Sequence, residues 1–200
     1  MAQGNATGVL TFDEKEHKYF LDGRHILNIT TILKLANLID DRWFSEEATV
    51  RGSAVHKAIL YSIQSDLEKK NLHPIVAPYF EAWEKFVNDF SFEPIKELCE
   101  KPQYHPDYFY AGTPDAIGHS KGRPWLVEVK TGDFKTAGYQ TAAQENFPEI
   151  KRLFVQRFVL KLNNDSTYKL IRQTDESDFE VFKSALNIAN LIKQKENPSW

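Results

Sequence analysis

The chain has 200 residues, of which 42% are hydrophobic, 26% charged and 13% aromatic, and its formal net charge is −3. This composition supplies enough apolar surface for a folded core and excludes a wholly disordered chain, and the length predicts a single domain over residues 1–200. The lone Cys99 excludes an internal disulfide, a four-cysteine zinc site and an iron–sulfur cluster.

The charge of the chain is unevenly distributed. Residues 1–120 carry a net charge of −6, residues 121–172 carry +5 and residues 173–200 carry −2. A basic block usually solvates a surface, but it is also the kind of segment that meets an acidic partner such as a nucleic acid. Neither a run of eighteen apolar residues nor a secretory leader occurs, so we expect a cytoplasmic protein that makes no contact with a membrane.

The first part of the chain predicts a hairpin followed by two helices. Asp22-Gly23 lies between two runs of alternating apolar and polar residues, which predicts an N-terminal β-hairpin extension over about residues 1–40. Ser45 is a good N-cap for a helix over residues 45–70, and a second helix is expected from about Pro78 to Phe90. Helical spacing predicts the buried positions, which are Ala48, Val55, Ile59 and Ile63 in the first helix and Phe80, Trp83 and Val87 in the second.

After Pro94 the apolar pattern becomes that of strands. Residues 95–104, 108–118 and 125–132 predict a meander of three strands. A short helix over residues 139–147, a strand pair formed by residues 151–162 and 167–173, and a last helix that begins near Asp175 or Ser177 complete the chain. The buried stripe predicted for that helix is Phe179, Phe182, Leu186, Ala189 and Ile192. The fold class expected is therefore mixed α/β (α+β).

Two acidic residues and a lysine fall in this strand region. Because strand side chains alternate between the two faces of a sheet, Glu128 and Lys130 share one face of their strand. A hairpin that turns at residues 120–123 pairs Ile117 with Leu126 and places Asp115 directly opposite Glu128.

Two carboxylates that face each other repel, and a divalent cation compensates them. Oxygen ligands favour magnesium or manganese, which can also lower the pKa of a bound water. Lys130 would then hold the nucleophile or stabilise charge that develops on phosphorus. The alternative is an ordinary salt bridge between Glu128 and Lys130 on an exposed sheet edge, with no cation bound.

These residues belong to an ordered set of motifs that resembles the PD-(D/E)xK nucleases, and within them the RecB-like and phage-exonuclease branch. The motifs are Arg51-Gly52-Ser53-Ala54-Val55-His56, similar to a Gly-x-x-x-His helix, then Glu100-Lys101-Pro102-Gln103-Tyr104, Tyr110-Ala111-Gly112-Thr113-Pro114-Asp115, Glu128-Val129-Lys130 and Tyr139-Gln140. They span residues 51–140, and residues 17–33 are also similar to leaders of phage members.

The resemblance implies a restriction-endonuclease-like core, in which helices flank a central mixed β-sheet. It also implies a site in which Asp115, Glu128 and the Val129 carbonyl hold Mg²⁺ or Mn²⁺. In this site His56 is an additional ligand, and Glu100 is a ligand or a positioning residue. Lys130 is the catalytic lysine, and Gln140 lies near metal and substrate. The tyrosine that usually follows Gln140 by four residues is Gln144 in this sequence, which is a departure from the pattern.

Five basic residues are candidates for contacts with DNA phosphates. In residues 156–162, Arg157 and Lys161 alternate with apolar residues, so both fall on one strand face. The alternative is that these residues lie on a sheet edge exposed to solvent. The candidates are Lys121, Arg123, Lys135, Arg157 and Lys161.

The function expected from the motifs and the resemblance is a Mg²⁺- or Mn²⁺-dependent deoxyribonuclease that hydrolyses phosphodiester bonds. The branch implies an exonuclease of phage or RecB-like type that acts on single- or double-stranded DNA ends in recombination, repair or processing, in a bacterial or phage-infected cell. The resemblance is also compatible with a homo-oligomer or with a recombination partner protein. A structure-specific endonuclease of the same fold and a catalytically silent module that binds nucleic acid or protein are the alternatives.

Overall fold

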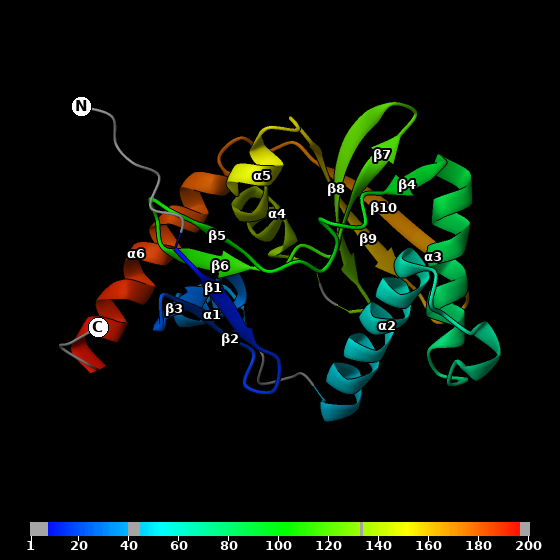
Figure 1. Ribbon diagram of the computed structural model, residues 1–200, viewed down its shortest axis with the longest axis horizontal. Helices are drawn as coiled ribbons and strands as arrows, with labels where there is room; N and C mark the ends of the chain where they lie inside the picture. The colour runs from blue at the N-terminus through cyan, green and yellow to red at the C-terminus, as the bar shows by residue number, and fades with distance from the viewer. Residues whose placement is uncertain (1–7, 40–44, 133, 197–200) are drawn as a thin grey trace.

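The computed structural model describes residues 8–39, 45–132 and 134–196. It contains two five-stranded mixed sheets with helices on their faces, which confirms the mixed α/β class (Figure 1). The helices are α1 (Ile29–Leu35), α2 (Glu46–Gln64), α3 (Ala77–Phe90), α4 (Ala137–Glu145), α5 (Pro148–Lys151) and α6 (Asp178–Glu196), with a short 3₁₀ helix at Lys69–Asn71. No helix in the described ranges is long and apolar enough to cross a membrane.

The first sheet has the strand order β1-β2-β3-β6-β5. Its strands are β1 (Leu10–Asp13), β2 (Lys18–Leu21), β3 (Arg24–Asn28), β5 (Gln103–His105) and β6 (Tyr110–Gly112). The predicted turn at Asp22-Gly23 is confirmed, because both residues have positive φ and join β2 to β3 in an antiparallel pair. β3 then pairs in parallel with β6, so the N-terminal strands are part of a larger sheet.

The second sheet has the order β10-β9-β8-β7-β4. Its strands are β4 (Phe92–Pro94), β7 (Ala116–Ser120), β8 (Arg123–Lys130), β9 (Gln156–Leu162) and β10 (Tyr168–Gln173). The β7–β8 hairpin has the predicted register, with Ile117 opposite Leu126. The predicted strand pair of residues 151–162 and 167–173 forms as the antiparallel pair β9–β10, but β9 begins only at Gln156, because α5 and a turn occupy residues 148–154. β8 and β9 run parallel, with Lys130 beside Lys161.

The predicted three-strand meander is wrong in two places. The segment at residues 108–118 divides into β6 and β7, which lie in different sheets, because residues 113–115 leave the ladder at Pro114, a residue with no N–H to donate. Residues 95–100 form turns rather than a strand, and only β5 remains of the strand predicted over residues 95–104.

The two long helices of the first half follow their predicted faces. Ser45 caps α2 by accepting a hydrogen bond from the Ala48 N–H, but the helix ends at Gln64 and not at residue 70. Its C-cap, Ser65, adopts a left-handed conformation that terminates the helix.

Two apolar cores lie on the two faces of the second sheet. Trp125, Val127 and Val129 point to the core covered by α2 and α3. Leu126 points to the other core, which α1, α4 and α6 cover. This alternation along β8 is the one predicted from the sequence, and it directs Glu128 and Lys130 toward the α4 side.

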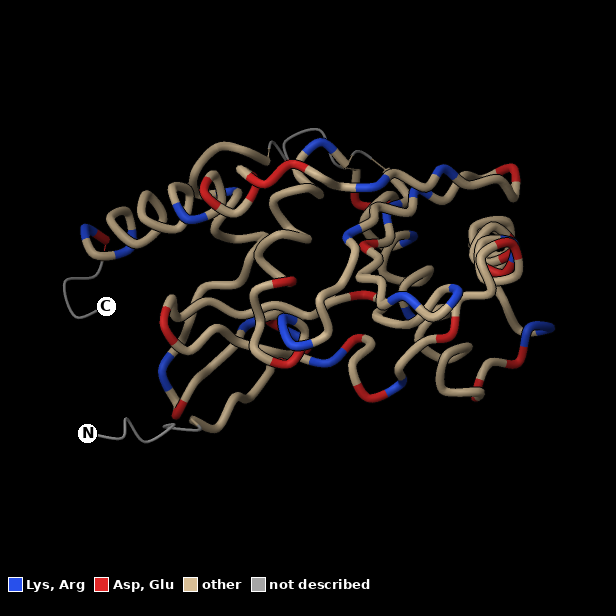
Figure 2. The backbone as a smooth tube through the Cα atoms, turned by 90° about the horizontal axis from the view of Figure 1, so that it is seen from above, with Lys and Arg blue, Asp and Glu red and all other residues tan. Residues whose placement is uncertain are grey.

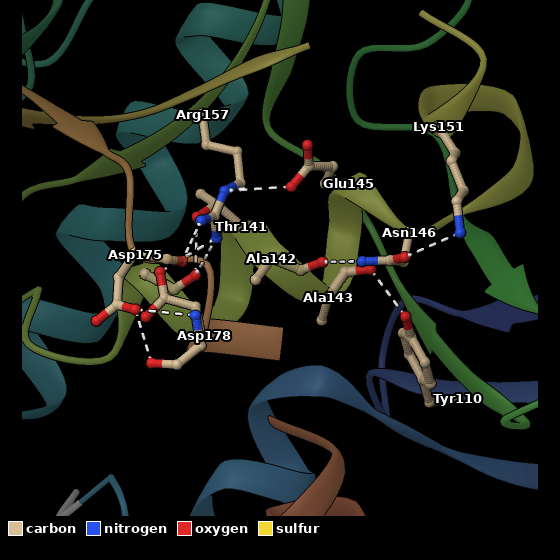
Figure 3. Close-up of polar contacts among 12 residues, drawn as sticks. Tyr110, Thr141, Ala142, Ala143, Glu145, Asn146, Lys151, Arg157, Asp175 and Asp178 are labelled. Atoms are coloured by element: carbon tan, nitrogen blue, oxygen red, sulfur yellow. Dashed lines mark hydrogen bonds and ion pairs between the residues drawn. The ribbon is translucent and has the colours of Figure 1, made fainter. Parts of the chain in front are cut away.

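A buried guanidinium fixes α4 and α6 to the second sheet (Figure 3). Arg157 of β9 donates to the Gly138 carbonyl of α4 at 3.1 Å, to Asp178 Oδ2 of α6 at 3.2 Å and to the Asp175 carbonyl at 2.8 Å. It also forms an ion pair with Glu145 at 3.2 Å. These contacts of Arg157 hold α4, the helix that faces Glu128, in a fixed position on the sheet.

We expect Arg157→Met to destabilise the protein by about 3–5 kcal/mol, because the change leaves the buried Asp178 carboxylate without its cation. Burial raises the pKa of Asp178 although Arg157 opposes the rise, and the variant raises it further. The loss should therefore be largest near neutral pH and shrink as the pH falls toward the ordinary aspartate value of about 3.9. Urea unfolding measures it, and a double variant with Asp178→Leu should recover part of the stability.

Candidate metal centre

The predicted site residues come together where the two sheets meet. His56 is on α2, Glu100 ends the turn before β5, and Asp115 lies in the junction that leads from β6 to β7. Glu128 and Lys130 lie on β8. Four segments that are distant in sequence thus supply one cluster of ionisable side chains.

His56, Glu100 and Asp115 form a group that could hold a metal ion. His56 Nδ1 lies 3.3 Å from Glu100 Oε1 and 3.3 Å from Asp115 Oδ1, and one ligand atom from each residue lies within 4.8 Å of the others. Glu100 has a φ of 50°, and its N–H donates to the Pro114 carbonyl at 2.8 Å. The left-handed backbone of a glutamate costs stability, and such conformations cluster at functional sites.

Asp115 does not pair directly with Glu128 as the sequence predicted. The β7–β8 ladder begins at Ala116, which lies opposite Val127, so Asp115 precedes it. Its Oδ2 instead accepts a hydrogen bond from the Val129 N–H at 2.6 Å. This hydrogen bond holds the Asp115 carboxylate against β8, and the other carboxylate oxygen, Oδ1, faces His56.

Glu128 is held by two donors. Lys130 Nζ lies 2.6 Å from Oε1, and Gln144 Nε2 donates to Oε2 at 2.9 Å. The ion pair with Lys130 that we considered as a surface salt bridge therefore forms, but its setting differs, because Glu128 is only 4% exposed. A buried pair of this kind is a weak source of stability.

The glutamine beside Glu128 is not the one that the resemblance indicated. Gln140 lies one turn earlier on α4, where its Nε2 is 3.5 Å from Thr30 Oγ1. Gln144, the departure from the family pattern, makes the contact with Glu128, and its Oε1 is buried without a hydrogen-bond partner in the described part of the chain. Gln140 and Gln144 lie on the same face of α4, and Gln144 is the one at the level of Glu128.

Burial and mutual charge shift the pKa values in this cluster. Burial alone would lower the pKa of His56, but the charge and hydrogen bonds of Asp115 and Glu100 raise it to about 10. Burial also acts to raise the pKa of Asp115, which His56 and Lys130 nevertheless keep below its ordinary value.

The two glutamates shift in the opposite direction. Burial and the Asp115 charge raise the pKa of Glu100 to about 7, although His56 opposes the rise. The same two causes raise the pKa of Glu128 despite Lys130 and Gln144. The cluster therefore contains three carboxyl groups and two cations, His56 and Lys130. This excess of acidic groups favours the binding of additional positive charge.

Sequence reasoning missed residues that support Asp115. Tyr19 of β2 is buried, and its hydroxyl lies 2.8 Å from Thr113 Oγ1. Burial raises the pKa of Tyr19, and the charges of Glu100 and Asp115 raise it further despite the Thr113 bond. Through this contact the first sheet stabilises the junction between β6 and β7 that carries Asp115. The resemblance of residues 17–33 was a signal for this segment, but it did not identify Tyr19.

The predicted basic residues do not converge. Lysines and arginines are interspersed with acidic residues along the backbone (Figure 2). Lys121 and Arg123 are exposed at the β7–β8 turn, at the opposite end of β8 from Lys130, and Lys135 is exposed before α4. Lys161 lies beside Lys130, and its Nζ is 5.7 Å from the centre of the Phe134 ring.

Arg157 differs from the other basic candidates. Its guanidinium is buried and bonds to protein carbonyls and carboxylates, so it does not present the free cation that we expected for DNA. The alternation in residues 156–162 placed it on the predicted face, but α4 and α6 cover that face.

No protein-family model matches the chain, and no curated protein matches it. Eleven chains of solved structures are similar to it. One is the crystal structure of LHK-Exo in complex with dAMP, with 12% sequence identity over 86% of this chain and 89% of that chain and a TM-score of 0.43. Function is therefore inferred from the residues of the site itself.

We expect Gln144→Leu to destabilise the protein by about 1.5–3 kcal/mol, because it leaves a buried carboxylate oxygen of Glu128 without its donor. The matched control is Gln140→Leu on the same helix, whose longer bond predicts a loss below about 1 kcal/mol. Urea unfolding of both variants measures the difference. Equal losses would show that Gln144 has no special role at Glu128.

Proposed function

We propose that His56, Glu100 and Asp115 bind a divalent cation, with Glu128 beside them. The support is the donor set: three ligand atoms from an imidazole and two carboxylates lie within 4.8 Å of one another, and manganese and magnesium take such ligands. Burial and the Asp115 charge raise the pKa of Glu100 and of Glu128, and a cation bound beside these carboxylates would oppose that rise. The Val129 carbonyl stays in this proposal as a further ligand from the edge of β8.

The function that this site supports best is hydrolysis of DNA phosphodiester bonds. A bound cation would neutralise phosphoryl oxygens and lower the pKa of a water. Lys130, whose Nζ lies 2.6 Å from Glu128 Oε1, would orient that water or stabilise charge developing on phosphorus. Asp115, fixed by the Val129 N–H, and His56 keep the ligand atoms in place.

The substrate proposal uses the basic residues that remain accessible. Lys161 lies beside Lys130 on the neighbouring strand and is the nearest candidate for a phosphate adjacent to the reacting one. Lys121, Arg123 and Lys135 are further candidates, whereas Arg157 and Gln140 are not assigned a contact with substrate. The motif set favours an exonuclease, and a structure-specific endonuclease is the second candidate.

Cation binding can be tested without turnover. We expect Mn²⁺ to bind the metal-free protein, and Asp115→Asn to weaken binding at least about ten-fold, because the change removes a charged ligand while keeping the side-chain shape. Isothermal titration calorimetry and the Mn²⁺ electron paramagnetic resonance signal measure the affinity. Asp107→Asn, in an exposed turn, is the matched control and should bind as the unmodified protein does. Unchanged Mn²⁺ affinity in Asp115→Asn would refute the metal site.

Cleavage can be tested with end-labelled linear single-stranded, linear double-stranded and closed circular DNA in Mg²⁺, Mn²⁺ or EDTA. We expect cation-dependent loss of the linear DNA only, and a rate at least about 100-fold lower in Lys130→Met, which loses the donor beside Glu128. Lys169→Met, on exposed β10, controls for a general loss of positive charge. Cutting of circles would support the endonuclease. Cation binding without cleavage would support the alternative that the protein is a catalytically silent binding module.

A further inference from the structure

Phe154 lies in the turn between α5 and β9 and is 87% exposed. Its neighbours Leu153 and Val155 both pack into the apolar core. The backbone at Phe154 has a φ of 53°, a left-handed conformation that bulky residues rarely adopt. The turn thus presents an aromatic ring outward from an anchored segment.

The fold gains little from a phenylalanine at this position. The ring is almost fully in solvent, so burial does not stabilise it, and a glycine or asparagine would suit the left-handed backbone better. An exposed ring that the packing does not explain is a candidate contact for a partner.

Two cations precede the ring and indicate the chemistry of that partner. Lys151 and Arg152 are both exposed, and neither makes an ion pair within the described ranges. Lys151 Nζ is 3.3 Å from the amide oxygen of Asn146, a neutral group (Figure 3). A single exposed ring beside unpaired cations fits a base and its phosphates better than an apolar protein patch.

The turn precedes the start of β9, and Lys161, toward the end of that strand, pairs with Lys130. At a strand rise of about 3.3 Å per residue, the five steps from Gln156, the first residue of β9, to Lys161 span about 17 Å. Phe154 lies two residues before Gln156, in the left-handed turn. The side chain of Lys101, next to Glu100, forms an ion pair of 3.1 Å with Glu149 of α5, so α5 also lies close to the Glu100 segment.

We propose that Phe154, Arg152 and Lys151 form a second nucleic-acid contact, in which a base of a single-stranded DNA segment stacks on Phe154 while the two cations meet its phosphates. The proposal rests on the proposed function, because the metal centre is taken to hold the same strand.

The test measures binding of fluorescein-labelled single-stranded DNA by fluorescence anisotropy in Mn²⁺, in the slow-cleaving Lys130→Met background, with oligonucleotides of about 4 and about 16 nucleotides. In this background Phe154→Ala should weaken binding of the long oligonucleotide at least about five-fold and leave binding of the short one, which does not span both contacts, unchanged. Arg152→Ser should reduce the slope of log affinity against log salt by about 1 for the long oligonucleotide only.

Phe109→Ala is the matched control for the ring. Phe109 is 60% exposed and also has a left-handed φ of 52°, but Asp107 precedes it in place of two cations. It should leave both affinities unchanged. Lys70→Ser, in the 3₁₀ helix between α2 and α3, is the control for loss of one exposed positive charge.

The outcomes separate this inference from the proposed function. Unchanged long-oligonucleotide affinity in Phe154→Ala would overturn the second contact, even if the protein cleaves DNA. Loss of long-oligonucleotide affinity in Phe154→Ala, with Mn²⁺ affinity unchanged in the same variant, would support it, even if no cleavage occurs. A Phe154→Ala variant that loses self-association in sedimentation, with DNA binding unchanged, would assign the surface to protein contact and overturn the proposal.

Discussion

The hydrogen bond from the Val129 N–H to Asp115 Oδ2 is the interaction on which the site depends. It joins the junction between the two sheets to the edge of β8 at the point where Asp115 leaves the ladder. The Tyr19 hydroxyl on Thr113 and the Glu100 N–H on the Pro114 carbonyl hold the other side of the junction. The chain can therefore pass from one sheet to the other and still present a carboxylate in a fixed direction.

The same arrangement has an electrostatic cost. Asp115, Glu128 and Glu100 lie close together in a largely buried place, where His56, Lys130, the Val129 N–H and Gln144 partly offset their charge. Apolar residues of similar volume would pack there without this repulsion. Folding alone does not explain three acids at this position, whereas the divalent cation proposed for His56, Glu100 and Asp115 would. The left-handed backbone of Glu100 adds strain at the same place, which agrees with a site kept for its chemistry.

Local patterns in the sequence predicted the parts of the fold that depend on periodicity. The β7–β8 register and the faces of β8 followed from the alternation of side chains, because a shift of one residue would turn Glu128 into the core that now holds Trp125 and turn Trp125 out of it. The break at residues 113–115 and the turns at residues 95–100 were not predictable in this way, since both depend on contacts between sheets. Whether Gln140 or Gln144 contacts Glu128 depends on how α4 is placed along β8, and no local signal in the sequence contains that information.

The parallel β8–β9 pair explains why charged residues of one segment have different roles. Arg157 and Lys161 share a face, but α4 and α6 cover the first, while the second lies at the carboxyl end beside Lys130. Position along β9 therefore decides whether a cation fixes helices or is accessible to a ligand. Phe154 lies in the turn before the same strand, and the candidate metal centre lies toward the other end of β8 and β9. A strand keeps its two ends at a more constant spacing than a loop of the same length would.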